Sequence, residues 1–398
     1  MTRRASYLLL GLSALGFVSL GLPDGVLGVA WPSIRASYGL PLDALGLLLV
    51  ATTAGYVTSS FAAGVVMARM TVGALLAISC LVTAGSLIGY AAAPGWGPMV
   101  ALGVLAGLGA GAIDAGINAY AATWHSARAV GLLHAFYGAG TTVGPIVMTS
   151  LLTAGHSWRR GYLAIGITQL VLAGCFAATL RWWPRAHLEP GATSAITGLW
   201  STLRLRAAQL GVATFFLYVG LEVIAGAWVF SLLRGPRGAS TAFAGAAVST
   251  FWAGLMVGRL ALALAPRTLA PSAVVRPCIV AAGLAAGVLA LDLGLVASVV
   301  AIALLGLAAG PIFPALMSST PARMQAAHTP NAVGFQVAGA AVGQSILPAL
   351  VGVFAQTIGL EVVPAALVAV SVLLWLTYGA LERAAPACAA DAAARDAA

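Results

Sequence analysis

The feature that most constrains this chain is a series of long apolar segments that repeats from one end to the other. Each is about 20 residues long, which is the length of α-helix that crosses the hydrocarbon core of a bilayer. The alternating strands of a membrane barrel would not give continuous apolar runs of this kind. Only 7% of the 398 residues are charged, against about 25% in a soluble globular protein. The sequence therefore predicts an all-α membrane protein with twelve transmembrane helices, expected at 6–32, 43–67, 72–93, 98–122, 129–154, 161–183, 207–232, 239–264, 272–291, 294–317, 331–357 and 360–382.

The distribution of positive charge predicts how these spans are oriented. All 19 basic residues are Arg, and they lie between spans or at span ends, so the net charge of +9 does not indicate a nucleic-acid partner. With the N-terminus in the cytoplasm, 14 arginines lie inside, and Arg35, Arg159, Arg160, Arg234 and Arg237 lie outside. The excess of positive charge on the cytoplasmic side places both termini there. A chain rich in Ala, Gly and Arg but without Lys is typical of a GC-rich bacterial genome, so we expect a multi-pass protein of the bacterial inner membrane.

The longest polar connector divides the chain into two halves. It predicts an N-terminal six-helix bundle (1–183), a cytoplasmic central loop (184–206), a C-terminal six-helix bundle (207–383) and a cytoplasmic tail (384–398). The segment GLGAGAI at 107–113 matches GLAAGPI at 306–312, an offset of 306 − 107 = 199.

Two further spans support this internal repeat. Phe136, Gly140 and Gly144 match Phe335, Gly339 and Gly343 at the same offset of 199. In the first span of each half, Asp24 and Gly28 match Glu222 and Gly226 at an offset of 198. One glycine match could arise by chance, but several spans that share one offset indicate two related six-span halves.

Three of the ten acidic residues, Asp24, Asp114 and Glu222, fall inside apolar spans. A charged side chain at mid-bilayer costs from about 3 to more than 10 kcal/mol, so such residues are functional candidates. Asp114 shares one helical face with Gly107, Gly111 and Asn118, at i, i+4, i+7 and i+11. The alternative is a glycine packing seam with a structurally bonded acid. Function is favoured for Asp114, because Asn would pack as well without an ionisation penalty.

Polar and aromatic side chains on several spans are candidates for the wall of a solute cavity. Rings stack on sugar faces, while amides and carboxylates bind hydroxyl groups, so such a cavity suits a polyhydroxylated ligand. For any single Trp the alternative is a packing or interfacial role, and for His134 it is a structural hydrogen bond. The expected lining residues are Trp31, Asn118, His134, Tyr137, Tyr218, Glu222, Trp228, Trp252, Gln336 and Gln344.

No Arg lies at the middle of a span, and Arg259 comes nearest, close to the inner end of span eight. Asp24 and Asp114 therefore have no evident cationic partner in the sequence. Desolvation favours the neutral form of such a carboxyl group, so both residues are candidate proton-coupling sites. The same absence argues against a strongly anionic solute. The four cysteines show no paired spacing, so neither a metal site nor a cofactor is expected, and the proton is the expected coupling ion.

The parallel six-span repeat resembles the major facilitator superfamily of transporters. The loop after span two, GVVMARMTVG, keeps the Gly64 and Arg69 of that superfamily's signature but has Ala68 in place of the usual Asp. Within the superfamily, GAGAIDAGINAY at 109–120 resembles span four of the fucose and glucose/galactose proton-symporter-like group. This chain carries Asp114 where that group more often has Glu.

The resemblance implies roles for individual residues. It places the proton-coupling acid of span four on Asp114 and the following amide on Asn118. It places the span-one acid near the substrate on Asp24, in GLPDGVLGVAW, and it places Glu222 of YVGLEVIAGAW in the cavity wall. Tyr137 stands where the group would have a polar amide, which leaves the sugar specificity open.

The leading hypothesis is a proton-coupled transporter of a small neutral, sugar-like solute that works by alternating access, as a monomer in the lipid bilayer. The alternative is a proton-driven exporter of a lipophilic or cationic compound. A membrane receptor or an enzyme is less favoured, because the chain has no phosphate-binding loop, no zinc-protease motif and no Ser/His/Asp grouping.

Overall fold

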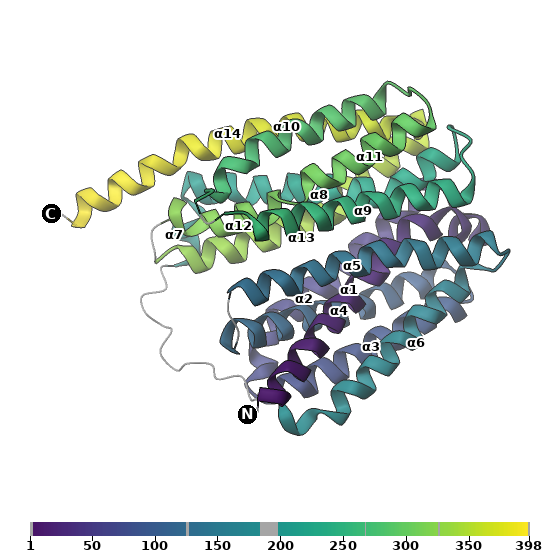
Figure 1. Ribbon diagram of the computed structural model, residues 1–398, viewed down its shortest axis with the longest axis horizontal. Helices are drawn as coiled ribbons and strands as arrows, with labels where there is room; N and C mark the ends of the chain where they lie inside the picture. The colour runs from purple at the N-terminus through teal and green to yellow at the C-terminus, as the bar shows by residue number, and fades with distance from the viewer. Residues whose placement is uncertain (1–2, 125–126, 184–197, 267, 325–326, 397–398) are drawn as a thin grey trace.

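The computed structural model describes residues 3–124, 127–183, 198–266, 268–324 and 327–396 (Figure 1). In this part of the chain all regular structure is helical, and twelve helical segments are long and apolar enough to cross a membrane. The expected all-α membrane fold with twelve spans is therefore confirmed. Most ends of the observed helices differ from the expected ones by a few residues, but the last helix continues to Asp396, well beyond its expected end at 382.

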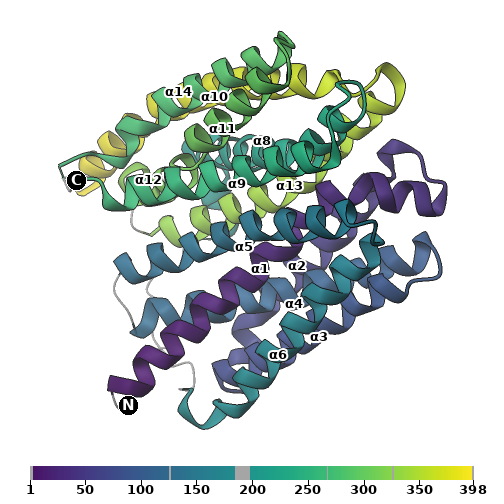
Figure 2. The same ribbon diagram turned by 45° about the vertical axis from the view of Figure 1, so that its right-hand side comes forward.

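The helices form two bundles that lie side by side (Figures 1 and 2). The first bundle consists of α1 (Arg3–Tyr38), α2 (Leu45–Met67), α3 (Val72–Ala92), α4 (Trp96–Trp124), α5 (Ala127–Thr153) and α6 (Trp158–Ala178), with the short turns η1 (Leu42–Ala44) and η2 (Leu180–Trp182). The second consists of α8 (Arg206–Arg234), α9 (Thr241–Leu264), α10 (Pro271–Ala290), α11 (Leu295–Ala309), α12 (Ile312–Arg323), α13 (Thr329–Ile358) and α14 (Val362–Asp396), and is preceded by α7 (Leu199–Leu203).

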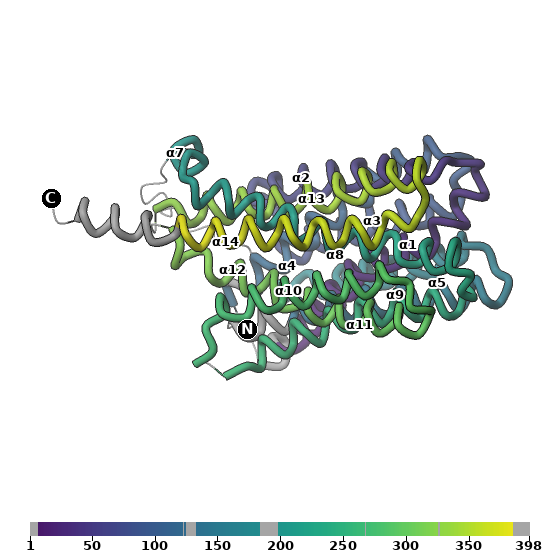
Figure 3. The backbone as a smooth tube through the Cα atoms, turned by 90° about the horizontal axis from the view of Figure 1, so that it is seen from above, coloured from purple at the N-terminus to yellow at the C-terminus, as the bar shows by residue number. Residues whose placement is uncertain are grey.

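The first helix begins and the last helix ends at the same end of the molecule, which we call the near end (Figures 1 and 3). The opposite end, where α1 ends and α2 begins, is the far end. Of the expected central loop at 184–206, residues 184–197, which include Arg185 and Glu189, lie outside the described residues. The exact limits of the two halves and their orientation in the membrane stay predictions.

Span ten differs in helix geometry from its counterpart in the repeat, span four. It is divided into α11 and α12 at Gly310 and Pro311, whereas α4 runs without a break through the matching position, Ala112. Proline has no amide hydrogen to donate to the preceding turn, and its ring clashes with the carbonyl group four residues earlier. The sequence change from Ala112 to Pro311 therefore removes a helix hydrogen bond at the position of the break, directly after Gly310.

The two bundles contact each other through α1 and α8, α5 and α9, and α2 and α13. One close approach is between Gly28 and Gly226, the two glycines that match in the repeat, because a Cβ atom on Gly28 would overlap the carbonyl oxygen of Gly226. Hydrogen bonds between described residues also join the bundles. Gln344 Nε2 donates to Thr53 Oγ1 at 3.3 Å, and the Leu42 amide donates to Gln356 Oε1 at 2.6 Å. These hydrogen bonds and the glycine contact lie from the middle of the molecule toward the far end.

We predict that Gly28→Leu separates the bundles at the far end. The larger side chain cannot fit against the Gly226 carbonyl group, so the conformation open at the far end becomes favoured. Distances between spin labels on the far ends of α1 and α13, measured in a cysteine-free background, should increase. Gly11→Leu is the matched control on the same helix, because a Cβ atom there meets no neighbouring atom within 4 Å. Equal distances in the two variants would contradict the prediction.

Candidate functional site

Asp114 lies in a hydrogen-bonded cluster inside the first bundle. The Tyr56 hydroxyl donates to Asp114 Oδ2 at 2.5 Å, and Asn118 Nδ2 donates to Oδ1 at 2.9 Å. Asn118 Oδ1 lies 3.1 Å from His134 Nε2, and because this oxygen can only accept, the histidine nitrogen carries the hydrogen. We call these four residues, Tyr56, Asp114, Asn118 and His134, the span-four cluster.

The glycines of span four explain why this cluster forms. A Cβ atom on Gly107 would overlap the carbonyl oxygen of Thr52, and one on Gly111 would overlap that of Tyr56. The missing side chains let α2 approach α4 closely, which brings Tyr56 within reach of Asp114. The glycine stripe is thus a packing seam, and that seam positions the partner of the acid.

Asp24 lies on the face of α1 that turns toward the second bundle. The Tyr137 hydroxyl donates to Asp24 Oδ2 at 2.8 Å. The neighbouring Gly21 and Gly25 are buried against the backbone of α5, where a Cβ atom would overlap the carbonyl oxygens of Tyr137 and Thr141. Asp24 is exposed between these two buried glycines. A carboxyl group in the middle of a transmembrane helix therefore has open space beside it.

Glu222, the third acid, is held differently. The Tyr218 hydroxyl lies 2.8 Å from Glu222 Oε2 and 3.0 Å from the Ala309 carbonyl oxygen. Arg259 Nη2 lies 3.1 and 3.3 Å from the two Glu222 carboxylate oxygens. The guanidinium carbon of Arg259 also lies 5.9 Å from the ring centre of Tyr137 in the other bundle.

A continuous series of contacts therefore joins the two bundles, from Asp24 through Tyr137 and Arg259 to Glu222. His134 of the span-four cluster lies one turn before Tyr137 on α5, so the same helix carries both groups. The structure brings together seven of the residues predicted for the site in these two groups: Asp24, Asp114, Asn118, His134, Tyr137, Tyr218 and Glu222.

The other predicted residues lie apart from these groups. Trp31 is fully buried and contacts the Trp96 ring at 5.6 Å. Trp252 is buried against Phe251, with ring centres 5.1 Å apart. Gln336 Oε1 accepts a hydrogen bond from Thr320 at 2.9 Å inside the second bundle.

Trp228 and Gln344 hold helices together. Trp228 is fully buried, and its Nε1 donates to the Pro348 carbonyl oxygen of α13 at 3.0 Å. Gln344 joins the bundles through Thr53. Both residues therefore have packing or bridging contacts in this conformation.

Sequence reasoning missed two residues of the site, Tyr56 and Arg259. Tyr56 precedes Ser59 and Ser60 on span two at i+3 and i+4, a polar pattern that could have indicated an inward face. Arg259 follows Trp252 and Met256 on one stripe of span eight. Because it lies near the inner end of the span, the sequence did not indicate that its side chain contacts Glu222. The inference that no arginine is available at the centre is corrected by its contact with Glu222.

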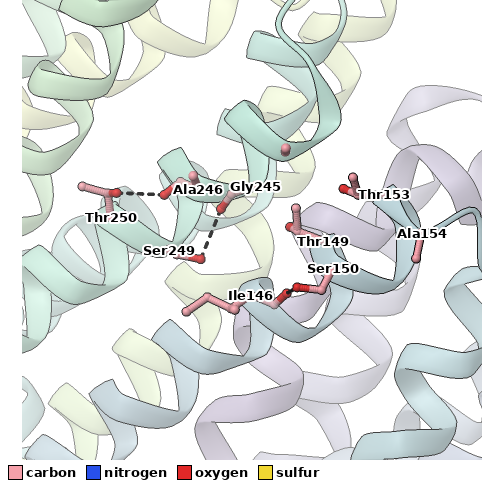
Figure 4. A pocket seen from close by; sticks show the side chains of 10 residues that line it. Ile146, Thr149, Ser150, Thr153, Ala154, Gly245, Ala246, Ser249 and Thr250 are labelled. Atoms are coloured by element: carbon pink, nitrogen blue, oxygen red, sulfur yellow. Dashed lines mark hydrogen bonds between the residues drawn. The ribbon is translucent and has the colours of Figure 1, made fainter.

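A groove lies between α5 and α9 toward the far end, and its side chains differ in kind from those around the three acids (Figure 4). Its volume is about 660 Å³, and it is lined by small, hydroxyl and apolar side chains without any titratable group. Ser150, Ser249 and Thr250 direct their hydroxyls to carbonyl groups of their own helices. This groove therefore offers no group for proton transfer. In the described part of the chain there is also no cluster of His, Cys, Asp and Glu that could hold a metal ion.

Comparisons with known proteins identify the family and the fold. A family model described as Major Facilitator Superfamily matches residues 13–291. The Saccharomyces cerevisiae protein "Bypass of stop codon protein 6" is 26% identical over 407 residues, which covers 91% of this chain and 80% of the yeast protein.

Solved transporter structures share the fold. A variant of the nucleoside transporter NupG is 15% identical, with a TM-score of 0.80 over 94% of this chain and 99% of NupG. The E. coli fucose:proton symporter FucP is 16% identical, with a TM-score of 0.63 over 92% and 97%. A D-xylose-proton symporter is 14% identical, with a TM-score of 0.69 over 93% and 97%. At these identities the likeness establishes the fold.

We predict that Trp228 stabilises the second bundle. Trp228→Ala leaves a cavity between α8 and α13 and removes the hydrogen bond to Pro348, a change that typically costs about 3–5 kcal/mol. The midpoint of thermal unfolding in detergent should fall. Trp200→Ala is the control, because Trp200 is 75% exposed and its loss should leave the midpoint unchanged. An unchanged midpoint in Trp228→Ala would contradict a packing role.

Proposed function

Because the chain belongs to the major facilitator superfamily, we propose that it is a secondary active transporter of a small neutral, sugar-like solute, driven by protons through Asp114 and Asp24. At the level of the family, the protein is a multi-pass membrane transporter and not an enzyme. The proposed mechanism is alternating access, in which the space between the bundles opens to one side of the membrane at a time.

The observation that carries this proposal is the kind of partner each acid has. Asp24 and Asp114 are held by tyrosine hydroxyls and an amide, whereas Glu222 is paired with Arg259. A hydroxyl can donate to an ionised carboxylate or accept from a protonated one, but a guanidinium can only donate. The partners of Asp24 and Asp114 therefore suit both protonation states, and the partner of Glu222 suits one.

Asp114 illustrates the point in detail. When ionised, it accepts hydrogen bonds from Tyr56 and Asn118. When protonated, its new hydroxyl can donate to the Tyr56 oxygen, while its carbonyl oxygen still accepts from Asn118. Both oxygens of Asp114 therefore keep a hydrogen-bond partner in either protonation state, which suits a carboxyl group that gains and loses a proton.

The charges near Asp24 disfavour a strongly anionic solute. Arg259 lies over the ring of Tyr137, whose hydroxyl holds Asp24. Its charge is already balanced by Glu222, so a strongly anionic solute would have to displace that carboxylate. Solved structures with the same fold are titled as nucleoside, fucose and D-xylose transporters, and these solutes are neutral and rich in hydroxyl groups.

Asp24 and Tyr137 are proposed to meet the solute, since Asp24 is exposed between the bundles. Asn118 and His134 are proposed to relay the effect of protonation at Asp114 along α5. The excess of arginines near one end supports cytoplasmic termini, and we propose the bacterial inner membrane as the site of action, with the monomer as the working unit.

We predict that Asp114→Asn abolishes accumulation against a gradient and spares exchange without a gradient. Asn fills the same space and keeps an acceptor for Asn118, but it cannot release a proton. Uptake of radiolabelled sugars and nucleosides into vesicles, with and without an imposed pH gradient, measures both activities. A thermal-shift screen of sugars, nucleosides and drugs at two pH values selects the solute beforehand.

Asp292→Asn is the control for loss of a carboxylate, because Asp292 lies at the far end and its side chain is 57% exposed. This variant should accumulate solute like the unmodified protein. Unchanged uphill uptake by Asp114→Asn would refute the coupling role of Asp114.

A further inference from the structure

Arg259 occupies an unusual position between acids that belong to different bundles. It is paired with Glu222 of its own bundle, and the two side chains are only 14% and 7% exposed. On its other side lies the ring of Tyr137, whose hydroxyl holds Asp24 of the first bundle. One buried positive charge thus faces one acid directly and a second acid across a single side chain.

The pairing with Glu222 uses only part of the guanidinium group. Both contacts to the carboxylate come from Nη2, whereas the usual fork-like pairing of Arg with a carboxylate uses two nitrogens. Arg259 Nε is buried and has no hydrogen-bond partner. A buried donor without a partner is unfavourable, so this arrangement leaves Arg259 with capacity for another acceptor.

Asp24 is an acceptor that can use this capacity. It is exposed and is held by one tyrosine hydroxyl. The titratable groups around Arg259 and Asp24, counted together with these two residues, belong to six helices. They are Tyr218 and Glu222 on α8, Tyr137 and His134 on α5, Tyr56 on α2, Tyr162 on α6, and Asp24 and Arg259 themselves on α1 and α9.

We propose that Arg259 is a counter-charge shared by Glu222 and Asp24, which exchanges one for the other during transport. When Asp24 is ionised, Arg259 is attracted across the interface and holds the bundles together at this level. When Asp24 takes up a proton, Arg259 is held by Glu222 alone, and the attraction between the bundles is lost. Arg259 thereby converts protonation in one bundle into a change of contact between the two.

This inference rests on the proposed role of Asp24 as a proton site, and it assigns a positioning role to Arg259. Its consequence is specific. When the charge of Glu222 is removed, Arg259 should be attracted to Asp24 alone. The affinity of Asp24 for its proton should then fall. The effect depends on Arg259 being present, so it should vanish when Arg259 is neutral.

The experiment measures protonation of Asp24 without any solute. Infrared spectra of the full chain in lipid are recorded as a function of pH, and the band of the protonated carboxyl is assigned by its loss in Asp24→Asn. Four proteins are compared: the unmodified chain, Glu222→Gln, Arg259→Gln and the double variant. We expect Glu222→Gln to move the midpoint of the Asp24 band to lower pH by about one unit, a tenfold change in proton affinity.

In the Arg259→Gln background, the same Glu222→Gln change should move the midpoint little. Equal shifts in the two backgrounds would mean that Glu222 acts on Asp24 directly, and would overturn the inference. Glu361→Gln is the matched control, since Glu361 pairs with Arg237 at 2.7 Å near the far end, and it should leave the Asp24 band unmoved.

Transport assays on the same variants separate this inference from the proposed function. Proton-driven accumulation with equal midpoint shifts would retain the function and remove the role of Arg259. If the Asp24 midpoint depends on Arg259 but the protein shows no proton-driven accumulation, the role of Arg259 would be retained and the proposed function would be refuted. If Glu222→Gln fails to fold, Arg259→Gln alone provides the test. The Asp24 midpoint in this variant should lie at higher pH than in the unmodified chain. An unmoved midpoint would contradict the inference.

Discussion

The structure depends on how three carboxyl groups are satisfied away from bulk water. In a chain with so few charged residues, each acid inside a span needs partners that the neighbouring helices must supply. Tyr56 and Tyr137 supply hydroxyls to Asp114 and Asp24, and the helices that carry them can approach only because the facing positions are glycines. The hydrogen bonds of these acids therefore depend on the close packing of the helices.

The acids of the two bundles differ in the kind of partner that holds them. The first bundle contains the acids with neutral partners, Asp24 and Asp114, which are the proposed proton sites. The second contains the ion pair of Glu222 and Arg259, which is proposed to change position. A transport cycle of this kind combines a change of proton occupancy on one side with a change of position on the other.

Much of this architecture could be predicted from the sequence. The apolar runs and the offset of 199 residues indicated twelve spans in two repeats, and superfamily membership confirms the resemblance based on them. The acids could be found because ionisable residues are rare in spans. The partners could not, because Tyr56 and Arg259 lie 58 and 37 residues from the acids they contact. Such pairings depend on how helices pack, which residue periodicity along one helix does not encode.

The break at Pro311 has a mechanical consequence. Span four is one unbroken rod that carries Asp114, whereas its counterpart is two shorter rods joined at Gly310 and Pro311. The hydrogen-bond ladder that stiffens a helix is interrupted there, so bending is easier at this joint than anywhere along α4. Of these two matching spans, the one that carries Asp114 is therefore the stiffer, and its counterpart in the second bundle is the one that can bend near its middle.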